Sequence, residues 1–317
     1  MREIVKNFIK IHNLENKKIL VGFSGGADSC ALLNCLNSLK TELNIELIAL
    51  HLNHNWRGES AKSDENFAKE FSKKLGIKFY TETLSNETPK TETIAREKRY
   101  EFFVSCAKKF NSNCVMLAHN KNDNLETLVY RIIKGTGIEG LKAIPAIREI
   151  FYRPLLTVSR EEIVEYLKEN NLNWIEDNSN EDTNYNRNYI RHTLMPMFEK
   201  INPTYKNSLE NLITVANNEC EILDNALSNA QKQIFFEDKI NTQEFLKLIY
   251  PMKLKIVYNF LKNDLKFYDL KRIKRIVDFI IEQAKEEQDP QFRKYKKFSI
   301  NSKLFLYVNK KEIFKGE

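Results

Sequence analysis

The sequence predicts an α/β fold, with a doubly wound parallel sheet in residues 1–200 and a smaller, mainly helical domain in residues 201–317. Short apolar runs alternate with amphipathic stretches through the first 170 residues, which is typical of strand–helix units in a parallel sheet. A glycine-rich turn joins the first apolar run to the first helical stretch. After Asn202 and Pro203 the buried-strand runs stop and long helical stretches follow, which indicates a second domain.

The first domain is expected to contain four buried strands, at residues 19–23, 46–50, 77–80 and 115–118. Apolar residues recur at helical spacing between and after them, which predicts helices at residues 30–39, 61–75, 93–110 and 125–133. A further helix begins at the capping box of Ser159 and Glu162 and ends near Asn170. In such a sheet, ligands bind at the carboxyl ends of the strands.

The last third of the chain is expected to be mainly helical. Helical stretches are predicted at residues 205–230, 242–261 and 269–286. The tail at residues 298–314 alternates enough to form a hairpin around Asn309 and Lys310. We place the domain boundary near residues 195–205.

Composition narrows the class of protein. The formal net charge of +7, with most of the excess after residue 200, is compatible with a polyanionic partner. The five cysteines are odd in number and form no C-x-x-C, which argues against a disulfide framework or a metal cluster and favours reduced, buried thiols in the cytoplasm. The N-terminus has no apolar signal segment, and no stretch approaches the roughly 20 apolar residues of a membrane span.

The glycine-rich turn is the first chemical signal. It reads Ser24-Gly25-Gly26-Ala27-Asp28-Ser29 and lies between the first strand and the first helix. Glycines let the backbone turn its N–H groups toward a phosphate, the helix adds its positive end, and the two serines can donate hydroxyl hydrogen bonds. An acid at position 28 would repel a bare phosphate, so a Mg²⁺ ligand or an orienting group explains it better. The alternative is an ordinary turn, and the loop fits neither G-x-x-x-x-G-K-[ST] nor G-x-G-x-x-G.

The motif S-G-G-x-D-S in this place resembles the signature of the PP-loop ATP pyrophosphatases, which have an adenine nucleotide alpha hydrolase-like fold. Over residues 17–203 the chain resembles one family among them, the tRNA(Ile)-lysidine synthetases. The matching segments are His51-Leu52-Asn53-His54 with Arg57, Ala95-Arg96 with Arg99-Tyr100, His119-Asn120 with Asp123 and Glu126, Arg131 before Gly135-Thr136-Gly137, Arg153-Pro154-Leu155-Leu156, Trp174 with Asp177 and Asp182, and Arg187-Asn188 with Arg191-His192. Asn122 departs from the pattern, since the family often has Asp at this position.

The resemblance implies a reaction and its cofactors, ATP and Mg²⁺. The O2 oxygen of the wobble cytidine in the CAU-anticodon isoleucine tRNA attacks the α-phosphate of ATP, and pyrophosphate leaves. The amine of free L-lysine then attacks C2 and expels AMP. The implied catalytic residues are Asp28, Asp123, Glu126 and His119, with Asp28 also a metal ligand. The implied ATP-binding residues are Ser24, Gly25, Gly26, Ala27, Asp28, Ser29, His51, Asn53, Arg57, Gly135 and Gly137.

Each of these groups also has an ordinary structural explanation. Asp123 and Glu126 are three apart on one helix face, where acids are usually solvated; the resemblance implies a role toward Mg²⁺ or lysine. His51, His54 and His119 could be packing residues. The basic residues expected to bind tRNA or lysine could equally be surface charges; they are Arg96, Arg99, Arg187, Arg191, Lys271, Arg272, Lys274 and Arg275. A second basic run, with aromatic residues between its members, lies at residues 292–298.

Two other functions stay open on the sequence. Another PP-loop enzyme, such as a tRNA thiolase, is disfavoured because such enzymes often use cysteines and this chain has no C-x-x-C. A nucleotide- or RNA-binding protein without catalysis is disfavoured because Asp28 and Ser29 are both present. The sequence does not decide between a monomer and a homodimer.

Overall fold

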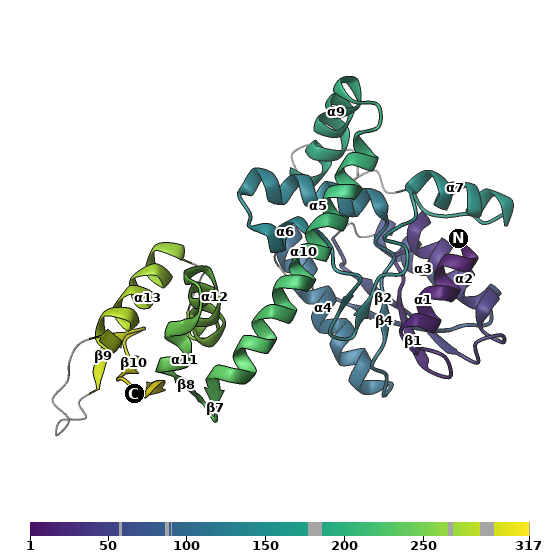
Figure 1. The fold of residues 1–317 in the computed structure, drawn as a ribbon. Coiled ribbons are helices and arrows are strands. Elements are labelled where there is room, and N and C mark those ends of the chain that lie inside the picture. Colours follow the sequence, from purple (N-terminus) through teal and green to yellow (C-terminus); the bar gives the residue numbers. More distant parts are fainter. Residues whose placement is uncertain are drawn as a thin grey trace. The chain divides into compact units, whose positions relative to one another are not determined.

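The computed structural model describes residues 1–56, 59–85, 89, 91–176, 186–265, 269–285 and 295–316 (Figure 1). It divides into two compact units, Met1–Asn217 and Asn218–Glu317, and each is described by itself. The division falls inside helix α10 (Tyr205–Ile234).

A mainly parallel sheet forms the centre of the first unit. In the described part of this unit, six strands follow the order β3-β2-β1-β4-β6-β5, and all neighbours are parallel except β5 and β6. The strands are β1 (Lys18–Gly22), β2 (Glu46–Asn53), β3 (Lys78–Thr83), β4 (Val115–Met116), β5 (Ile147–Arg148) and β6 (Phe151–Tyr152). The chain order reverses between β1 and β4, so a crevice is expected at the carboxyl ends of these two strands.

Alternate residues of the strands pack against two different layers of helices. Ile19 and Val21 of β1 lie in the core that includes α2, while Leu20 between them lies in the core on the opposite face. The first layer consists of α1 (Arg2–Ile11), α2 (Ala27–Leu39), α3 (Glu59–Lys74) and α7 (Arg160–Glu169), and the second of α4 (Glu92–Lys109). Helices on both faces confirm the predicted doubly wound sheet.

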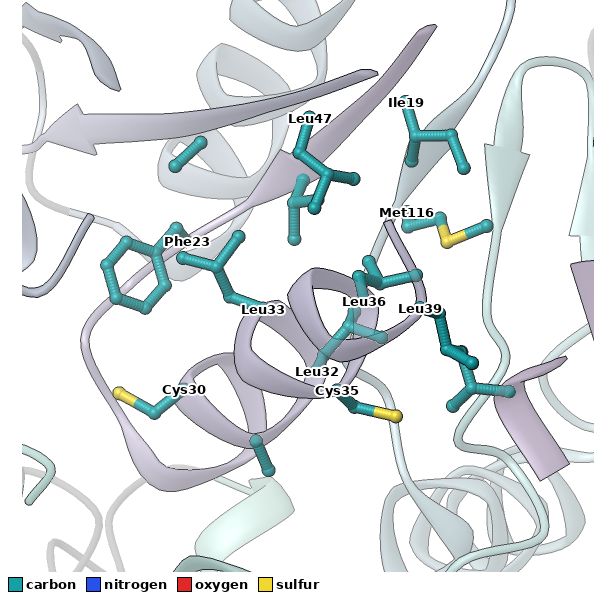
Figure 2. Packing of buried hydrophobic residues seen from close by; sticks show 14 of the residues in the cluster. Ile19, Phe23, Cys30, Leu32, Leu33, Cys35, Leu36, Leu39, Leu47 and Met116 are labelled. Carbon is teal, nitrogen blue, oxygen red and sulfur yellow. The ribbon is translucent and has the colours of Figure 1, made fainter. Parts of the chain in front are cut away.

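Helix α2 is buried on nearly all sides, and most of its residues are apolar. Leu32, Leu33, Leu36 and Leu39 are fully buried, and Figure 2 shows them beside Ile19, Leu47 and Met116 of the sheet. Each such leucine stabilises the fold by about 2 kcal/mol relative to an exposed position. The helix begins directly after the glycine-rich turn, so this packing fixes the position of the turn.

A third group of elements covers the start of α5 (Lys121–Lys134). Leu125, Leu128 and Val129 of α5 pack against Ile190 and Met195. Those two residues belong to a continuous helical run made of α8 (Asn186–Tyr189), the π-helix η2 (Ile190–Leu194) and α9 (Met195–Ile201). Short π-helical segments are rare and frequently occur at functional sites. The short helix α6 (Ile138–Leu141) follows α5.

The second unit combines helices with an antiparallel sheet. Among its described residues, five strands follow the order β7-β8-β11-β10-β9: β7 (Phe235–Phe236), β8 (Lys239–Asn241), β9 (Lys296–Ser299), β10 (Phe305–Val308) and β11 (Glu312–Gly316). The helices are the end of α10, α11 (Thr242–Lys247), α12 (Tyr250–Leu261) and α13 (Leu270–Lys285). Strands β10 and β11 form a hairpin whose turn contains Asn309 and Lys310.

The helical stretch expected at residues 242–261 is two helices, because the chain is extended at Leu248 and Ile249 and Pro251 opens the second helix. The sheet around the predicted hairpin was not expected. Its added strands are two to four residues long and contain few consecutive apolar residues, so they leave little periodic signal. No described helix is long and apolar enough to span a membrane.

Candidate functional site

Hydrogen bonds within the loop at residues 24–29 fix its conformation. The Ser29 hydroxyl donates to the Gly26 carbonyl at 2.9 Å and accepts from the Ser24 N–H at 3.3 Å. The Gly26 N–H donates to the Ser24 hydroxyl at 3.3 Å, and the two serine hydroxyl oxygens lie 3.2 Å apart. Gly26 is the N-cap of α2, so the loop ends at the positive end of that helix. This arrangement suits a bound phosphate.

Gly25 is the position in this loop where glycine is required. Its φ of +87° is in the left-handed region, and an added Cβ would lie 2.7 Å from Cδ1 of Ile175. The Gly25 carbonyl accepts a hydrogen bond of 2.9 Å from the Ile175 N–H, so the segment at residues 174–175 packs directly against the loop. A side chain at position 25 would therefore push the loop off its support.

The carboxylate of Asp28 lies at the switch point between β1 and β4. Its Oδ1 accepts from Nη1 of Arg160 at 2.6 Å and from Nδ2 of Asn120 at 3.1 Å. Burial raises the pKa of Asp28 above its ordinary value, and Arg160 opposes that rise. Asn120 follows β4 and Arg160 begins α7, so three segments far apart in the sequence meet at this acid.

Residues at the carboxyl end of β2 fix the neighbouring edge of the sheet. His51 donates from Nδ1 to the Phe23 carbonyl at 2.9 Å, and burial lowers its pKa, so the neutral ring ties the end of β2 to the entrance of the loop. Asn53 donates to Glu65 at 2.7 Å and accepts from the Asn55 N–H at 2.8 Å, so its amide holds the turn into α3. Both predicted ATP-pocket residues are buried and already make internal bonds. Arg57 lies outside the described residues.

The start of α5 positions a histidine and two acids. Asn120 and Asp123 form a capping box, with Asp123 accepting from the Asn120 N–H at 3.1 Å and the Asn120 side chain accepting from the Asp123 N–H at 2.9 Å. Nδ1 of His119 is buried and makes no hydrogen bond to any described residue. Burial, with the nearby charges of Arg153 and Arg187, lowers the pKa of His119 to about 4, so its ring is neutral.

Asp123 and Glu126 form a four-charge cluster with the two arginines predicted further along the chain. Arg187 contacts Asp123 at 2.6 Å and Glu126 at 3.1 Å. Arg191 contacts Glu126 at 2.6 Å and Asp123 at 3.3 Å. The side chain of Glu126 is only 3% exposed, whereas those of the arginines are 39% and 34% exposed. The guanidiniums therefore lie between the buried acids and solvent.

Arg96 and Arg99 both extend from α4 toward the same edge of the sheet. Arg99 lies 3.5 Å from Nε2 of His54, just after β2. Arg96 lies over the ring of Tyr100 at 5.4 Å, and its charge acts on His119 after β4. The structure thus places Arg99 at the end of β2 and Arg96 close enough to act on His119, which follows β4.

The second glycine cluster lies elsewhere. Gly135 (φ +83°) ends α5, and Gly137 is the N-cap of α6. Helix α5 has 14 residues and is therefore about 20 Å long, with Asn120 and Asp28 at its other end. The structure does not bring these two glycines to the loop at residues 24–29, although they were expected to bind ATP. In this structure they end one helix and start the next, and their contact with ATP stays a prediction.

The basic cluster on α13 belongs to the second unit. Lys271, Lys274 and Arg275 are exposed. Arg272 is half-buried and donates from Nη2 to the Ile300 carbonyl, so it ties α13 to the end of β9. The first three remain available to an anionic partner. In the second basic run Lys296 and Lys297 lie on β9, whereas Phe292, Arg293 and Lys294 lie outside the described residues.

Sequence reasoning missed two residues of this site, Arg160 and Asn120, as partners of Asp28. They are 132 and 92 residues away from Asp28. The sequence predicts a helix start at Ser159, directly before Arg160, and Asn120 lies in the His119-Asn120 motif, but neither pattern links these residues to Asp28. No spacing rule links such distant positions; only the sheet topology does, because it places the carboxyl ends of β1 and β4 side by side.

Comparisons with known proteins show which family this chain resembles. A family model described as a PP-loop domain matches residues 1–198. The tRNA(Ile)-lysidine synthase of Petrotoga mobilis is 36% identical over 76% of this chain and 83% of its own length. The chain belongs to the tRNA(Ile)-lysidine synthase family. Relatives of the same name from Clostridioides difficile (36% identical) and Clostridium tetani (42% identical) match 86% and 63% of this chain.

The chain spans only part of some lysidine synthases: the matches cover 63% of the Clostridioides difficile protein and 45% of the Clostridium tetani protein. Among solved structures, the U34-tRNA thiolase NcsA from Methanococcus maripaludis superposes with a TM-score of 0.55 at 18% identity, over 68% of this chain and 78% of that one. That likeness concerns the fold alone.

The residues of the loop fit the cofactors that a PP-loop family implies. Use of ATP follows from the family, and the open loop with two serine hydroxyls suits its phosphates. Among the described residues, no group of three or more His, Cys, Asp and Glu side chains could hold a metal ion by itself. Mg²⁺ usually binds through one or two carboxylates together with substrate phosphates and water, so the single carboxylate of Asp28 fits that pattern.

Proposed function

We propose that this chain is a tRNA(Ile)-lysidine synthetase. It ligates free L-lysine to C2 of the wobble cytidine in the CAU-anticodon isoleucine tRNA, through an adenylated tRNA intermediate, and releases pyrophosphate and AMP. Similarity to lysidine synthases over much of the chain supports this function. One structural observation supports it most: Asn120 contacts both Asp28 of the loop and Asp123 of the charge cluster.

This link matters because the reaction has two steps at one carbon. The nucleotide and the amino acid must both reach the same cytosine, so their sites must adjoin. Asn120 donates to Asp28 through its side-chain amide and caps α5 through its side-chain oxygen. The same residue therefore sets the distance between the predicted ATP site and the predicted lysine site.

In the first step, the loop holds the phosphates of ATP. The Ser24 hydroxyl and the N–H groups at the start of α2 donate to the phosphate oxygens, and the Ser29 hydroxyl joins them when it turns away from the Gly26 carbonyl. Asp28 would hold Mg²⁺, which when bound neutralises the charge that develops on the leaving pyrophosphate. The O2 oxygen of cytosine forms a bond to the α-phosphorus as the bond to pyrophosphate breaks. Positive charge from Arg96 and Arg99 at the same edge stabilises the phosphoryl group.

In the second step, the charge cluster receives lysine. Free lysine has two ammonium groups and one carboxylate, and the cluster offers two carboxylates and two guanidiniums. Asp123 or Glu126 can therefore bind the reacting amine of lysine. Arg187 or Arg191 can bind its carboxylate. The amine must lose a proton before it attacks C2, and a carboxylate at hydrogen-bond distance can accept it. The C2–O2 bond then breaks and AMP leaves with the oxygen.

The tRNA is expected to contact both units. The anticodon loop must present an unstacked cytosine to the edge of the sheet, as sequence-specific recognition of RNA loops requires. The exposed cations of α13 contact the phosphate backbone elsewhere on the tRNA. We place the reaction in the cytoplasm, where reduced thiols persist, since all five cysteines are described and buried and none forms a disulfide. The proposed reaction requires no second copy of the chain. The mass of the protein in solution tests whether it forms a homodimer.

Incorporation of labelled lysine into an unmodified CAU-anticodon isoleucine tRNA transcript tests the proposal. With ATP and Mg²⁺, the wild-type chain is expected to label this transcript and Asp28→Ala is not. A transcript with a GAU anticodon is the matched control, because it has no wobble cytidine. The chain could instead release pyrophosphate in the presence of tRNA without incorporating lysine. That result would support activation of the RNA by ATP but contradict lysine as the nucleophile.

A thiolase is a weaker candidate on the structure as well. The thiolate is the reactive form of cysteine. Burial raises the pKa of Cys30, Cys35 and Cys114 to about 12 and that of Cys106 to about 11, so these thiols stay protonated at neutral pH. Cys220 is buried too. The cysteines therefore have the properties of packing residues.

A further inference from the structure

The acid of the PP-loop is paired with a cation from a distant helix. Nη1 of Arg160 lies 2.6 Å from Oδ1 of Asp28, and the side chains are 41% and 31% exposed. The same oxygen accepts from Asn120. Yet Asp28 is the residue expected to coordinate Mg²⁺ in the complex with ATP, and none of the roles derived above uses Arg160.

The backbone of Arg160 is fixed while its side chain is long. Arg160 is the first residue of α7, where Ser159 and Glu162 form a capping box. Its N–H donates to Oδ1 of Asn122 at 3.1 Å. The Lys121 N–H donates to the Val158 carbonyl at 2.9 Å. These bonds join the first turns of α5 and α7, so the guanidinium can change partners without movement of the helix.

Mg²⁺ and a guanidinium compete for the same oxygen. A Mg²⁺ ligand oxygen lies about 2.0–2.1 Å from the ion, so a metal on Oδ1 would lie very close to Nη1 and the two cations would repel each other. A guanidinium displaced from Asp28 needs another anion, and a phosphate of ATP in the adjacent loop can accept two hydrogen bonds from its planar fork. Binding of Mg²⁺ and ATP therefore favours both the release of the Arg160 guanidinium from Asp28 and its binding to phosphate.

We propose that Arg160 is a phosphate-binding residue of this PP-loop, and that the Asp28–Arg160 ion pair is a resting contact that Mg²⁺ and ATP replace together. In the resting state Arg160 neutralises Asp28 and keeps the acid from repelling the incoming triphosphate. On binding, Asp28 passes to the metal and Arg160 to the β- or γ-phosphate. The inference rests on ATP use by the loop and not on the lysine step.

Asn122 positions Arg160 beside the loop. Its side-chain oxygen accepts the Arg160 N–H and so holds the first turn of α7 beside the loop. An aspartate offers an oxygen at the same place, so the contact survives whether position 122 is Asn or Asp. The contact therefore requires a hydrogen-bond acceptor at position 122 and not a charge.

Calorimetric titration of the full chain with a non-hydrolysable ATP analogue, with and without Mg²⁺, tests the proposal. Arg160→Gln is expected to weaken binding of the Mg²⁺-analogue complex by about 10- to 100-fold, the usual loss for a hydrogen bond to a charged group. Arg160→Lys keeps the charge without the planar fork and is expected to lie between Arg160→Gln and wild type. The Mg²⁺ concentration that half-saturates the complex is expected not to rise in Arg160→Gln, because Asp28 has lost its competitor. Inorganic pyrophosphate serves as a second probe, with the same ranking.

Lys168→Gln is the matched control, since Lys168 is an exposed cation on the last turn of the same helix. It is expected to bind the analogue as wild type does. Wild-type affinity in Arg160→Gln would overturn the proposal, as would a loss that only follows a fall in the melting temperature. Arg160-dependent nucleotide binding in a chain that fails to incorporate lysine would leave this inference standing and contradict the proposed function alone.

The positioning role of Asn122 has its own readout. Asn122→Asp keeps the acceptor oxygen and is expected to bind the analogue within about threefold of wild type, whereas Asn122→Ala is expected to weaken binding about tenfold. Equal affinity in Asn122→Ala and wild type would remove Asn122 from the account and leave Arg160 to be judged by its own variants.

Discussion

The carboxylate of Glu126 is bound by Arg191 at both oxygens: Nε lies 2.6 Å from Oε1 and Nη2 lies 3.0 Å from Oε2. Glu126 is almost fully buried, and Arg191 is half-exposed. A positively charged group of a ligand that binds Glu126 must therefore displace the guanidinium of Arg191.

Glu126→Gln tests whether this acid receives lysine. The amide keeps the shape and loses the charge, so we expect the KM for lysine to rise by about 10- to 100-fold. Pyrophosphate release that depends on tRNA but not on lysine is expected to stay near the wild-type rate. Steady-state kinetics of both reactions measure the two effects. An unchanged KM for lysine together with a lost first step would move Glu126 from the lysine site to the nucleotide site.

Gly25→Ala and Gly135→Ala form a matched pair, because both glycines have a positive φ and only the first has close neighbours. Gly25→Ala is expected to cost about 2 kcal/mol of stability and to weaken ATP binding more than tenfold. Gly135→Ala is expected to cost about 1 kcal/mol, with ATP affinity unchanged. Urea unfolding and nucleotide titration measure both. A loss of ATP affinity in Gly135→Ala would return that glycine to the cofactor site.

His119 makes stability depend on pH in a defined window. Burial holds its pKa at about 4, whereas the unfolded chain takes up the proton at about 6.5. Between these values the unfolded state binds more protons, so stability falls as the pH falls from about 6.5 to 4, by at most ~1.4 kcal/mol per unit. Urea unfolding at several pH values is expected to show that the free energy of unfolding changes less with pH in His119→Gln than in wild type. Identical slopes in the two proteins would mean that His119 protonates in the folded state without penalty.

The exposed cations of α13 are expected to set the salt dependence of tRNA binding. Replacing Lys271, Lys274 and Arg275 with Gln should weaken binding and lower the slope of log K against log salt by about 2–3. Lys10→Gln, an exposed cation on α1, is the control. Arg272→Gln is expected to lower the melting temperature instead, since it loses the bond to the Ile300 carbonyl. A triple variant with wild-type affinity and slope would remove α13 from the tRNA surface.

Much of the first unit could be predicted because its signals are local. The strands predicted at residues 19–23 and 46–50 are almost entirely apolar, and β1 and β2 lie there. The capping box at Ser159 marks the start of α7. The second unit was harder, since strands such as β8 have a single apolar residue between polar neighbours and are recognisable only when paired.

The site divides in the same way. The loop at residues 24–29 is contiguous, so its glycines, serines and acid are visible in the sequence. The partners of its acid are not, because Arg160 and Asn120 reach Asp28 only through the order of the strands. The neutralisation of Asp123 and Glu126 by Arg187 and Arg191 likewise depends on how α8 and η2 pack against α5.

Nucleoside analysis of the product tRNA by mass spectrometry shows whether lysine is joined to the wobble base. After incubation of the CAU-anticodon isoleucine tRNA with the chain, ATP, Mg²⁺ and lysine, we expect one modified nucleoside, a cytidine at the wobble position with lysine joined to C2 in place of its oxygen. An unmodified cytidine at that position, or lysine found as an alkali-labile ester at the 3′ end, would contradict the proposed function.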